Sequence, residues 1–153
     1  MSSTAPSPMA SSQAMIDAAK ASILAYNDKN WDNVRASLTP DALYDEVCTQ
    51  RKIQGLDQVV ECWQGWARAL PDSKATLHGT CASGNTVCIE MTWRGKHTGP
   101  LELPTGSVAA TQRDIEVRSC QVFEMSGTKA RTIRHYFDMA TMLQQLGIEG
   151  SAD

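Results

Sequence analysis

Segment 131–147, RTIRHYFDMATMLQQLG, places two titratable side chains where one sequence pattern gives way to another. Alternating residues over 132–137 predict a β-strand, and apolar residues at three- and four-residue steps over 139–146 predict a helix. His135 lies near the end of the expected strand, and Asp138 comes directly before the expected helix. A histidine and a carboxylate at such a junction can move protons, so both are candidate catalytic residues.

Strand alternation gives His135 a direction. It shares one face of the strand with Ile133 and Phe137, and the apolar character of this face predicts that it points inward. Burial lowers the pKa of a histidine unless a carboxylate lies near, which would keep His135 a neutral base. The alternative is a buried histidine satisfied by a backbone carbonyl. Asp138 also has a structural interpretation as helix N-cap, and its two roles do not exclude each other.

Further titratable groups are candidates for the same site. His97 ends a strand pattern and would be a second donor at the mouth of a pocket, or an exposed residue beside a turn. Glu124 would approach His135 if their strands pair through the MSGTK turn, giving a carboxylate–imidazole pair that orients a base. Asp45 and Glu46 are adjacent on a short strand, so one of them must point inward.

The composition argues against several other functions. The 153-residue chain has a net charge of −3 with acids and bases interspersed, which gives no sign of a nucleic-acid or membrane partner. No apolar run reaches the roughly 18 residues of a membrane-spanning helix. The start lacks the regions of a signal peptide, so we expect a cytoplasmic protein. The five cysteines form no CxxC pair, which predicts small core residues in a reducing compartment and no metal site.

Helices and strands must position these groups. Helices are expected over 13–28, over a short segment that Thr39-Pro40 ends, and from Gly55 to Pro71, with a short last helix after Asp138. Between the expected strands 86–97 and 111–125, TGPLELPTGSVAA is expected to be a loop that acts as a flexible rim or a lid. The strands that we expect are 42–47, 73–82, 86–97, 111–125 and 129–137.

The order of these elements predicts an α+β fold. A curved antiparallel sheet would be cupped by about three helices and would form a cone with a pocket at its open end. Residues 1–12 are expected to be a disordered tail, 13–148 a single domain, and 149–153 a second tail. Without a glycine-rich phosphate loop, a GxSxG motif or an HExxH motif, the sequence indicates acid–base chemistry that needs no cofactor.

Several segments, taken in order, resemble the SnoaL-like polyketide cyclase and ester cyclase family of the NTF2-like superfamily. The matching pieces are NDKNWDNVRASLTPDALYDE, GLDQVVECWQGWARALPD, VCIEMTWRGKHTG, PTG and RHYFDMATMLQQLG. The resemblance implies a cone cupped by three helices, a homodimer formed through the outer sheet face, and a pocket that works without a cofactor. In this family the general base is an aspartate or histidine near the end of the last strand. His135 and Asp138 match that place here, and which of them is the base stays open.

The resemblance also implies a reaction. It is proton abstraction next to a carbonyl of a small hydrophobic, polyketide-like substrate, followed by aldol-type cyclisation or isomerisation. His97, Tyr44 or Arg94 would stabilise the developing oxyanion. Each tryptophan has the alternative role of a core residue. The residues that we expect to bind the substrate are Tyr26, Trp31, Tyr44, Trp63, Trp66, Arg94, Ile133 and Phe137.

Two alternatives remain. One is a non-catalytic module that binds a small ligand in the same pocket, and the other is an epoxide-opening hydrolase or lyase on the same fold. The limonene-epoxide-hydrolase branch has a similar WRDYFD-like ending but needs an aspartate within it and an Arg-x-Asp on a neighbouring strand. This chain has His135 at the first place and Arg94-Gly95-Lys96 at the second, which argues against epoxide hydrolysis.

Overall fold

Four α-helices and eight strands follow one another in residues 10–148, the part of the chain that this computed structural model describes. Most of the two predicted tails, residues 1–9 and 149–153, lies outside the described residues. In chain order the elements are α1 (Ser12–Asn27), α2 (Trp31–Ala36), β1 (Leu38–Glu46), the 3-10 helix η1 (Val47–Thr49), β2 (Arg51–Gln54), α3 (Leu56–Ala69), β3 (Lys74–Ser83), β4 (Thr86–Lys96), β5 (Leu101–Leu103), β6 (Gly106–Val108), β7 (Asp114–Ser126), β8 (Lys129–Phe137) and α4 (Met139–Gln145).

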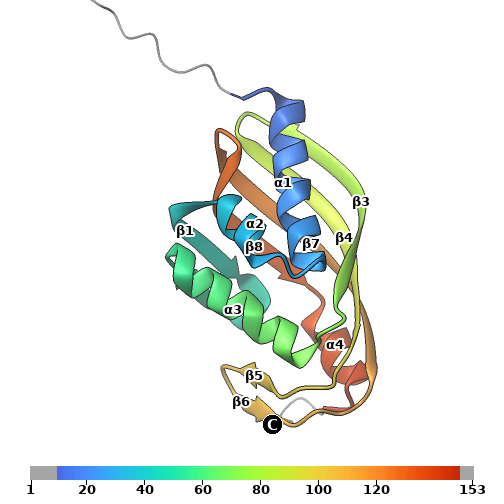
Figure 1. Ribbon diagram of the computed structural model, residues 1–153. Helices are drawn as coiled ribbons and strands as arrows, with labels where there is room; N and C mark the ends of the chain where they lie inside the picture. The colour runs from blue at the N-terminus through green and yellow to red at the C-terminus, as the bar shows by residue number, and fades with distance from the viewer. Residues whose placement is uncertain (1–9, 149–153) are drawn as a thin grey trace, which may run out of the picture.

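Six of the strands form one curved sheet in the order β2-β1-β8-β7-β4-β3. Helices α1, α2 and α3 cover one face of this sheet, while α4 and the β5–β6 hairpin lie at one end of the molecule (Figure 1). The predicted α+β cone is therefore confirmed. One pairing differs from the expected antiparallel sheet: β1 and β8 run parallel, while the other strand pairs of this sheet are antiparallel.

Alternation of side chains along β7 fixes which face of the sheet is covered. Every second residue from Ile115 to Met125 is buried, and the residues between them are exposed or partly exposed. The same pattern holds for β8, where Ile133 and His135 are buried and Tyr136 is exposed. Opposite this face, α3 buries Val59, Val60 and Trp63 along one side. Burial of these apolar side chains against each other is the main force that holds the helices on the sheet.

Two local expectations are wrong. Helix α2 ends at Ala36 rather than at Thr39-Pro40, and the strand that follows includes both of these residues. Pro40 is tolerated because it falls in the register shift between Leu38 and Leu43, where β1 skips its pairing with β8 and a missing N–H breaks no hydrogen bond of the ladder. The second wrong expectation is that residues 98–110 form only a loop, because this segment contains the β5–β6 hairpin.

The close approach of Gly99 to the end of α3 gives a stability prediction. A Cβ at Gly99 would clash with the carbonyl oxygen of Arg68, whereas a Cβ at Gly65, within α3, would meet only the Arg68 guanidinium at 3.6 Å. We expect Gly99→Ala to lower the free energy of unfolding by about 2 kcal/mol through this clash. Gly65→Ala should instead raise it by about 0.5–1 kcal/mol, because alanine favours helix. Urea unfolding measures both, and effects of the same sign would contradict the described contact.

Candidate active site

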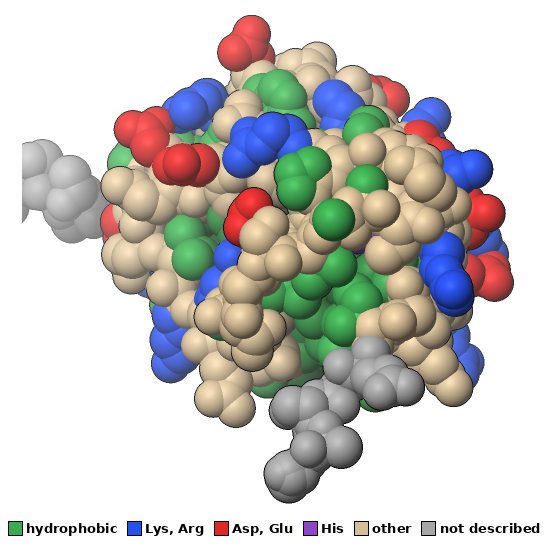
Figure 2. All heavy atoms as spheres, turned by 90° about the horizontal axis from the view of Figure 1, so that it is seen from below, with side chains coloured by type: hydrophobic (Ala, Val, Ile, Leu, Met, Phe, Trp, Pro, Cys, Tyr) green, Lys and Arg blue, Asp and Glu red, His purple; other side chains and the backbone are tan. Residues whose placement is uncertain are grey.

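A pocket lies between the concave face of the sheet and the helices. The cavity has a volume of about 80 Å³. Apolar side chains gather in a hollow at the end of the molecule that carries α4 and the β5–β6 hairpin (Figure 2). The residues that line the pocket are Ser22, Ile23, Tyr26, Tyr44, Trp63, Trp66, Leu70, Ser73, Trp93, Ile115, Val117, Gln121, His135, Phe137 and Met142. None of these is Asp, Glu, Lys or Arg, so the pocket suits an uncharged, largely apolar molecule.

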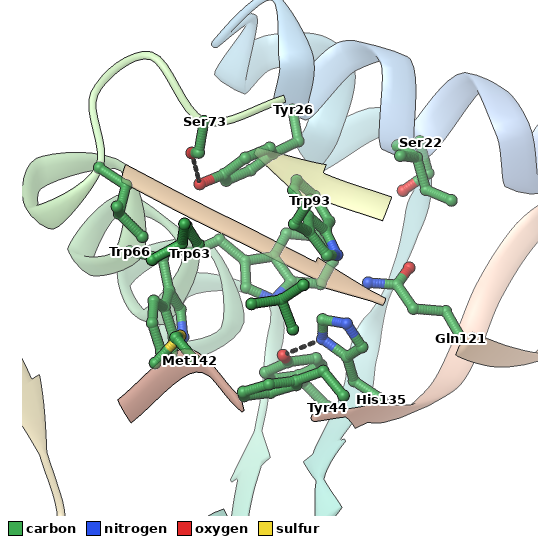
Figure 3. Close-up of a pocket in the computed structure, with 15 residues that line it drawn as sticks. Ser22, Tyr26, Tyr44, Trp63, Trp66, Ser73, Trp93, Gln121, His135 and Met142 are labelled. Carbon is green, nitrogen blue, oxygen red and sulfur yellow. Dashed lines mark hydrogen bonds between the residues drawn. The ribbon is translucent and has the colours of Figure 1, made fainter. Parts of the chain in front are cut away.

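A row of hydrogen bonds crosses three neighbouring strands beside this pocket. The Tyr44 hydroxyl lies 2.7 Å from His135 Nδ1 and 3.1 Å from Glu46 Oε2 (Figure 3 shows the Tyr44–His135 pair). On the other side of the ring, Ser119 Oγ lies 2.6 Å from His135 Nε2. All four side chains are at least nine-tenths buried. The imidazole is thus held at both nitrogens.

The row has a direction. A carboxylate oxygen can only accept, so the Tyr44 hydroxyl donates its one hydrogen to Glu46. The Tyr44 oxygen must then accept from His135 Nδ1–H, which leaves a lone pair on Nε2. Ser119 donates its hydroxyl hydrogen to that lone pair. The hydrogen bonds therefore fix the tautomer in which Nε2 is the basic nitrogen.

Glu46 anchors this row. Its side chain is fully buried at the end of β1, and its two oxygens accept hydrogen bonds from four other residues. Arg51 Nη2 donates across 2.8 Å and supplies the opposite charge, and Trp66 Nε1 donates across 2.9 Å. Thr49 and Tyr44 complete the set. A buried carboxylate is stable only with such partners, so these contacts hold it in one place.

Burial and the charge of Glu46 together set the protonation states of His135 and Tyr44. Burial lowers the pKa of His135 to about 4, and Glu46 raises it by a smaller amount. For Tyr44, burial first and the nearby Glu46 second raise the pKa well above its usual value. Near neutral pH the free protein therefore holds a neutral imidazole and a neutral phenol. The site can accept a proton, and it places no positive charge next to an apolar ligand.

The structure brings most of the predicted aromatic residues together. Five of the eight expected substrate-binding residues line the pocket: Tyr26, Tyr44, Trp63, Trp66 and Phe137. Trp31 instead packs edge-on against Tyr26, with ring centroids 5.8 Å apart, and Ile133 is buried in the core. Arg94 lies on the exposed side of β4, where it forms an ion pair with Glu116. These three do not reach the pocket, and Arg94 is not placed to stabilise an oxyanion there.

The other predicted catalytic residues lie outside the pocket. Asp138 is exposed and caps α4 by accepting from Thr141, whose hydrogen bonds also lower the pKa of this carboxyl. His97 is fully buried and contacts Thr111, so it is neither a donor at the pocket mouth nor an exposed residue. Burial also lowers its pKa.

The expected pair between Glu124 and His135 does not form. The register of β7 and β8 places Thr132 opposite Glu124, and the Glu124 carboxylate lies 3.6 Å from Arg134 on the other face of the sheet. Gln121 is the residue opposite His135. The carboxylate that orients the imidazole is Glu46, which acts through Tyr44.

Sequence reasoning missed three polar groups of this site. Ser119 and Gln121 belong to the buried face of β7, between Val117 and Phe123, and Trp93 belongs to β4. The first two carried a usable signal: two polar residues that interrupt an otherwise apolar inner face must be hydrogen-bonded or face a ligand. Trp93 carried no such signal, because a pattern of apolar residues does not show whether an indole N–H has a hydrogen-bond partner.

Fold and site together define an NTF2-like cone that holds an apolar pocket, with one oriented histidine at the pocket wall. A family model described as SnoaL-like polyketide cyclase matches residues 16–146. The chain belongs to this family. A search of curated proteins gives no match. Within residues 10–148, no helix is long and apolar enough to cross a membrane.

Solved structures agree with this fold. A candidate SnoaL-like polyketide cyclase from Jannaschia sp. CCS1 is 13% identical, with a TM-score of 0.80 over 97% of this chain and 100% of the other. IdmH, a candidate polyketide cyclase from Streptomyces antibioticus, is 21% identical with a TM-score of 0.72 over 86% and 97%. An LEH-like epoxide hydrolase from M. tuberculosis is also 21% identical, with a TM-score of 0.69 over 88% and 90%. At these identities the likeness shows the fold alone.

The lowered pKa of His135 predicts that the protein becomes less stable as the pH is lowered. The native ring titrates at about 4, and an unfolded histidine at about 6.5. Between these values the unfolded chain binds a proton that the native protein does not, so the free energy of unfolding decreases as the pH falls through this window. The loss should be about 3 kcal/mol.

His135→Gln isolates this effect, because glutamine does not titrate while other groups of the protein still do. Urea unfolding of both proteins at pH 7 and pH 4 gives the comparison. We expect the wild type to lose about 3 kcal/mol more than the variant between these two conditions. Equal losses would mean that the native ring titrates like an exposed one.

Replacing Ser119 tests the tautomer. A hydroxyl that donates to Nε2 stabilises the neutral ring, so Ser119→Ala should raise the pKa of His135 toward its usual value. A hydroxyl that accepts from Nε2–H would act in the opposite sense, and its removal would leave the pKa where it is or lower it. The imidazole NMR signals of His135, followed over pH in both proteins, distinguish the two cases.

Proposed function

We propose that this protein is a cofactor-independent acid–base enzyme. Its substrate would be a small hydrophobic carbonyl compound of polyketide type, and its reaction proton abstraction followed by aldol-type cyclisation or isomerisation. The observation that carries the proposal is the neutral His135 imidazole in an apolar pocket, with its basic nitrogen fixed by the hydrogen bonds to Tyr44 and Glu46. Membership of the SnoaL-like family supports the same class of reaction.

The chemical step uses His135 as the general base. Nε2 takes a proton from the carbon next to the substrate carbonyl, and the electron pair of that C–H bond moves into an enolate. The Ser119 hydroxyl occupies Nε2 in the free protein, so it turns away when the substrate enters. The imidazolium keeps its Nδ1–H bond to Tyr44, and the nearby carboxylate of Glu46 favours its charge. After ring closure or rearrangement, Nε2 returns the proton to the product.

The enolate also helps the base. In the empty pocket a pKa of about 4 makes His135 a weak base. An oxyanion that develops beside the ring raises this pKa, because an opposite charge a few ångströms away favours the imidazolium. Proton transfer and charge formation therefore support each other at one place, which is how an apolar site can run acid–base chemistry at neutral pH.

A non-catalytic binding module is the second candidate. The observation that favours it is that both ring nitrogens of His135 already have hydrogen-bond partners in the free protein. An epoxide-opening enzyme has less support. Such chemistry needs a carboxylate that activates water, no lining residue is Asp or Glu, and both oxygens of the nearby Glu46 already have donors.

Hydrogen–deuterium exchange of a simple ketone tests the proposal without knowledge of the substrate. We expect the wild-type protein to accelerate exchange of the α-protons of 2-tetralone in D₂O, followed by NMR. His135→Gln should lower the enzyme-dependent rate by about 10²–10⁴-fold, the usual contribution of a general base. Tyr44→Phe should lower it by roughly tenfold, because the ring then loses its fixed tautomer.

Asp138→Asn is the matched comparison, because asparagine keeps the helix cap and removes the other family candidate for the base. We expect this variant to exchange at the wild-type rate. If Asp138→Asn loses the activity while His135→Gln keeps it, the base is Asp138 and the proposal is wrong. If the wild type binds 2-tetralone and catalyses no exchange, the binding module is the better description.

A further inference from the structure

Two buried side-chain polar atoms lack a hydrogen-bond partner within residues 10–148, the indole nitrogen of Trp93 and Nε2 of His97. Only Trp93 of this pair lines the pocket. An indole N–H can donate and cannot accept, so the free group is a donor. Leaving such a donor buried and unpaired is unfavourable, and native proteins keep few of them without a reason. A ligand that carries an acceptor would supply the missing partner.

The neighbours of Trp93 place this donor beside the base. Its ring stands edge-on to Tyr26, with centroids 5.3 Å apart, and 6.2 Å from the centroid of the His135 ring. Gln121 is opposite His135 on the neighbouring strand and also lines the pocket. In Figure 3 the Gln121 amide is directed toward the side of the pocket where the Trp93 nitrogen and the imidazole lie. The indole nitrogen, the amide and the basic imidazole thus gather at one wall.

We propose that Trp93 Nε1–H, assisted by the Gln121 amide, donates to the carbonyl oxygen of the ligand and positions the adjacent carbon next to His135. The catalytic consequence rests on the proposed function, while the binding step does not. This assignment replaces His97, Tyr44 and Arg94 as oxyanion stabilisers. His97 and Arg94 lie outside the pocket, and the Tyr44 hydroxyl already donates to Glu46.

The surroundings of this donor also define the class of ligand. The pocket has no lysine or arginine in its lining, so a carboxylate or phosphate would lose its hydration without gaining an opposite charge. A neutral ketone or ester loses far less, and its oxygen accepts from a neutral N–H. Most other lining groups are aromatic or aliphatic. The site therefore fits an uncharged molecule with one inward-facing carbonyl on an apolar skeleton.

A pair of probes with the same skeleton tests this. The probes are 2-tetralone, labelled with ¹³C at its carbonyl, and the hydrocarbon tetralin, which has no acceptor. With the wild-type protein we expect the carbonyl carbon to shift downfield on binding, as it does when the oxygen accepts a hydrogen bond. An indole N–H signal of the ¹⁵N-labelled protein should move with 2-tetralone and stay in place with tetralin. These two measurements need no variant.

Trp93→Phe keeps an aromatic ring and removes the N–H. We expect it to weaken 2-tetralone binding about tenfold, to leave tetralin binding within about twofold, and to abolish the carbonyl shift. Trp31→Phe is the matched control, since Trp31 packs against the same Tyr26 without lining the pocket, and it should leave all three unchanged. Gln121→Leu should reduce the carbonyl shift in part.

Several results would overturn the assignment: no binding of 2-tetralone at millimolar concentration, equal binding of both probes by the wild type, or an equal loss of both in Trp93→Phe. An unchanged carbonyl shift in Trp93→Phe would do the same. Failure of the proposed function has a different signature. In that case the wild type binds 2-tetralone with the carbonyl shift and catalyses no exchange of its α-protons.

Discussion

The buried carboxylate of Glu46 is the interaction on which the site depends. It lies at the C-terminal end of β1 and is fully buried, where an isolated charge would be strongly unfavourable. Its partners come from separate elements: Arg51 from β2, Thr49 from η1, Trp66 from α3 and Tyr44 from β1 itself. One carboxylate therefore fixes the edge of the sheet, the turn before it and the position of a pocket-lining helix.

The orientation of the His135 imidazole follows from that anchor. Because Tyr44 gives its hydrogen to Glu46, its oxygen must accept from His135. The Glu46 carboxylate thus determines, through two successive hydrogen bonds, which ring nitrogen is basic. The apolar walls lower the pKa of the ring, and Glu46 opposes them only in part. Burial sets the protonation state, while the hydrogen-bonded row sets the tautomer. Neither effect alone would give a neutral base with a defined direction.

The sequence predicted the parts that depend on local periodicity. Alternation in β8 correctly predicted that His135 points inward. The apolar stripe of α3 identified Trp63 and Trp66 as residues that face the pocket. Both patterns report which face of an element is turned to the interior. Pairing partners were not accessible in the same way. The register of β7 and β8 is set by their turn and by an irregularity between Glu124 and Met125, and this register puts Gln121 opposite His135. A sequence shows that one of Asp45 and Glu46 must face inward, but the donors that select Glu46 come from residues 49, 51 and 66.

The polar groups must decide the chemistry on this fold, because the fold itself is shared by a candidate polyketide cyclase and by an epoxide hydrolase at similar low identity. Glu46 already accepts from four residues, so its oxygens are not available to bind and activate a water molecule. The pocket wall instead combines the basic nitrogen of His135, which accepts one hydrogen bond from Ser119, with the unpaired donor of Trp93. A base and a donor side by side match the two atoms that change charge when a carbon next to a carbonyl loses its proton. In the proposed function, the arrangement of these two groups, more than the family fold, favours carbon-acid chemistry over hydrolysis.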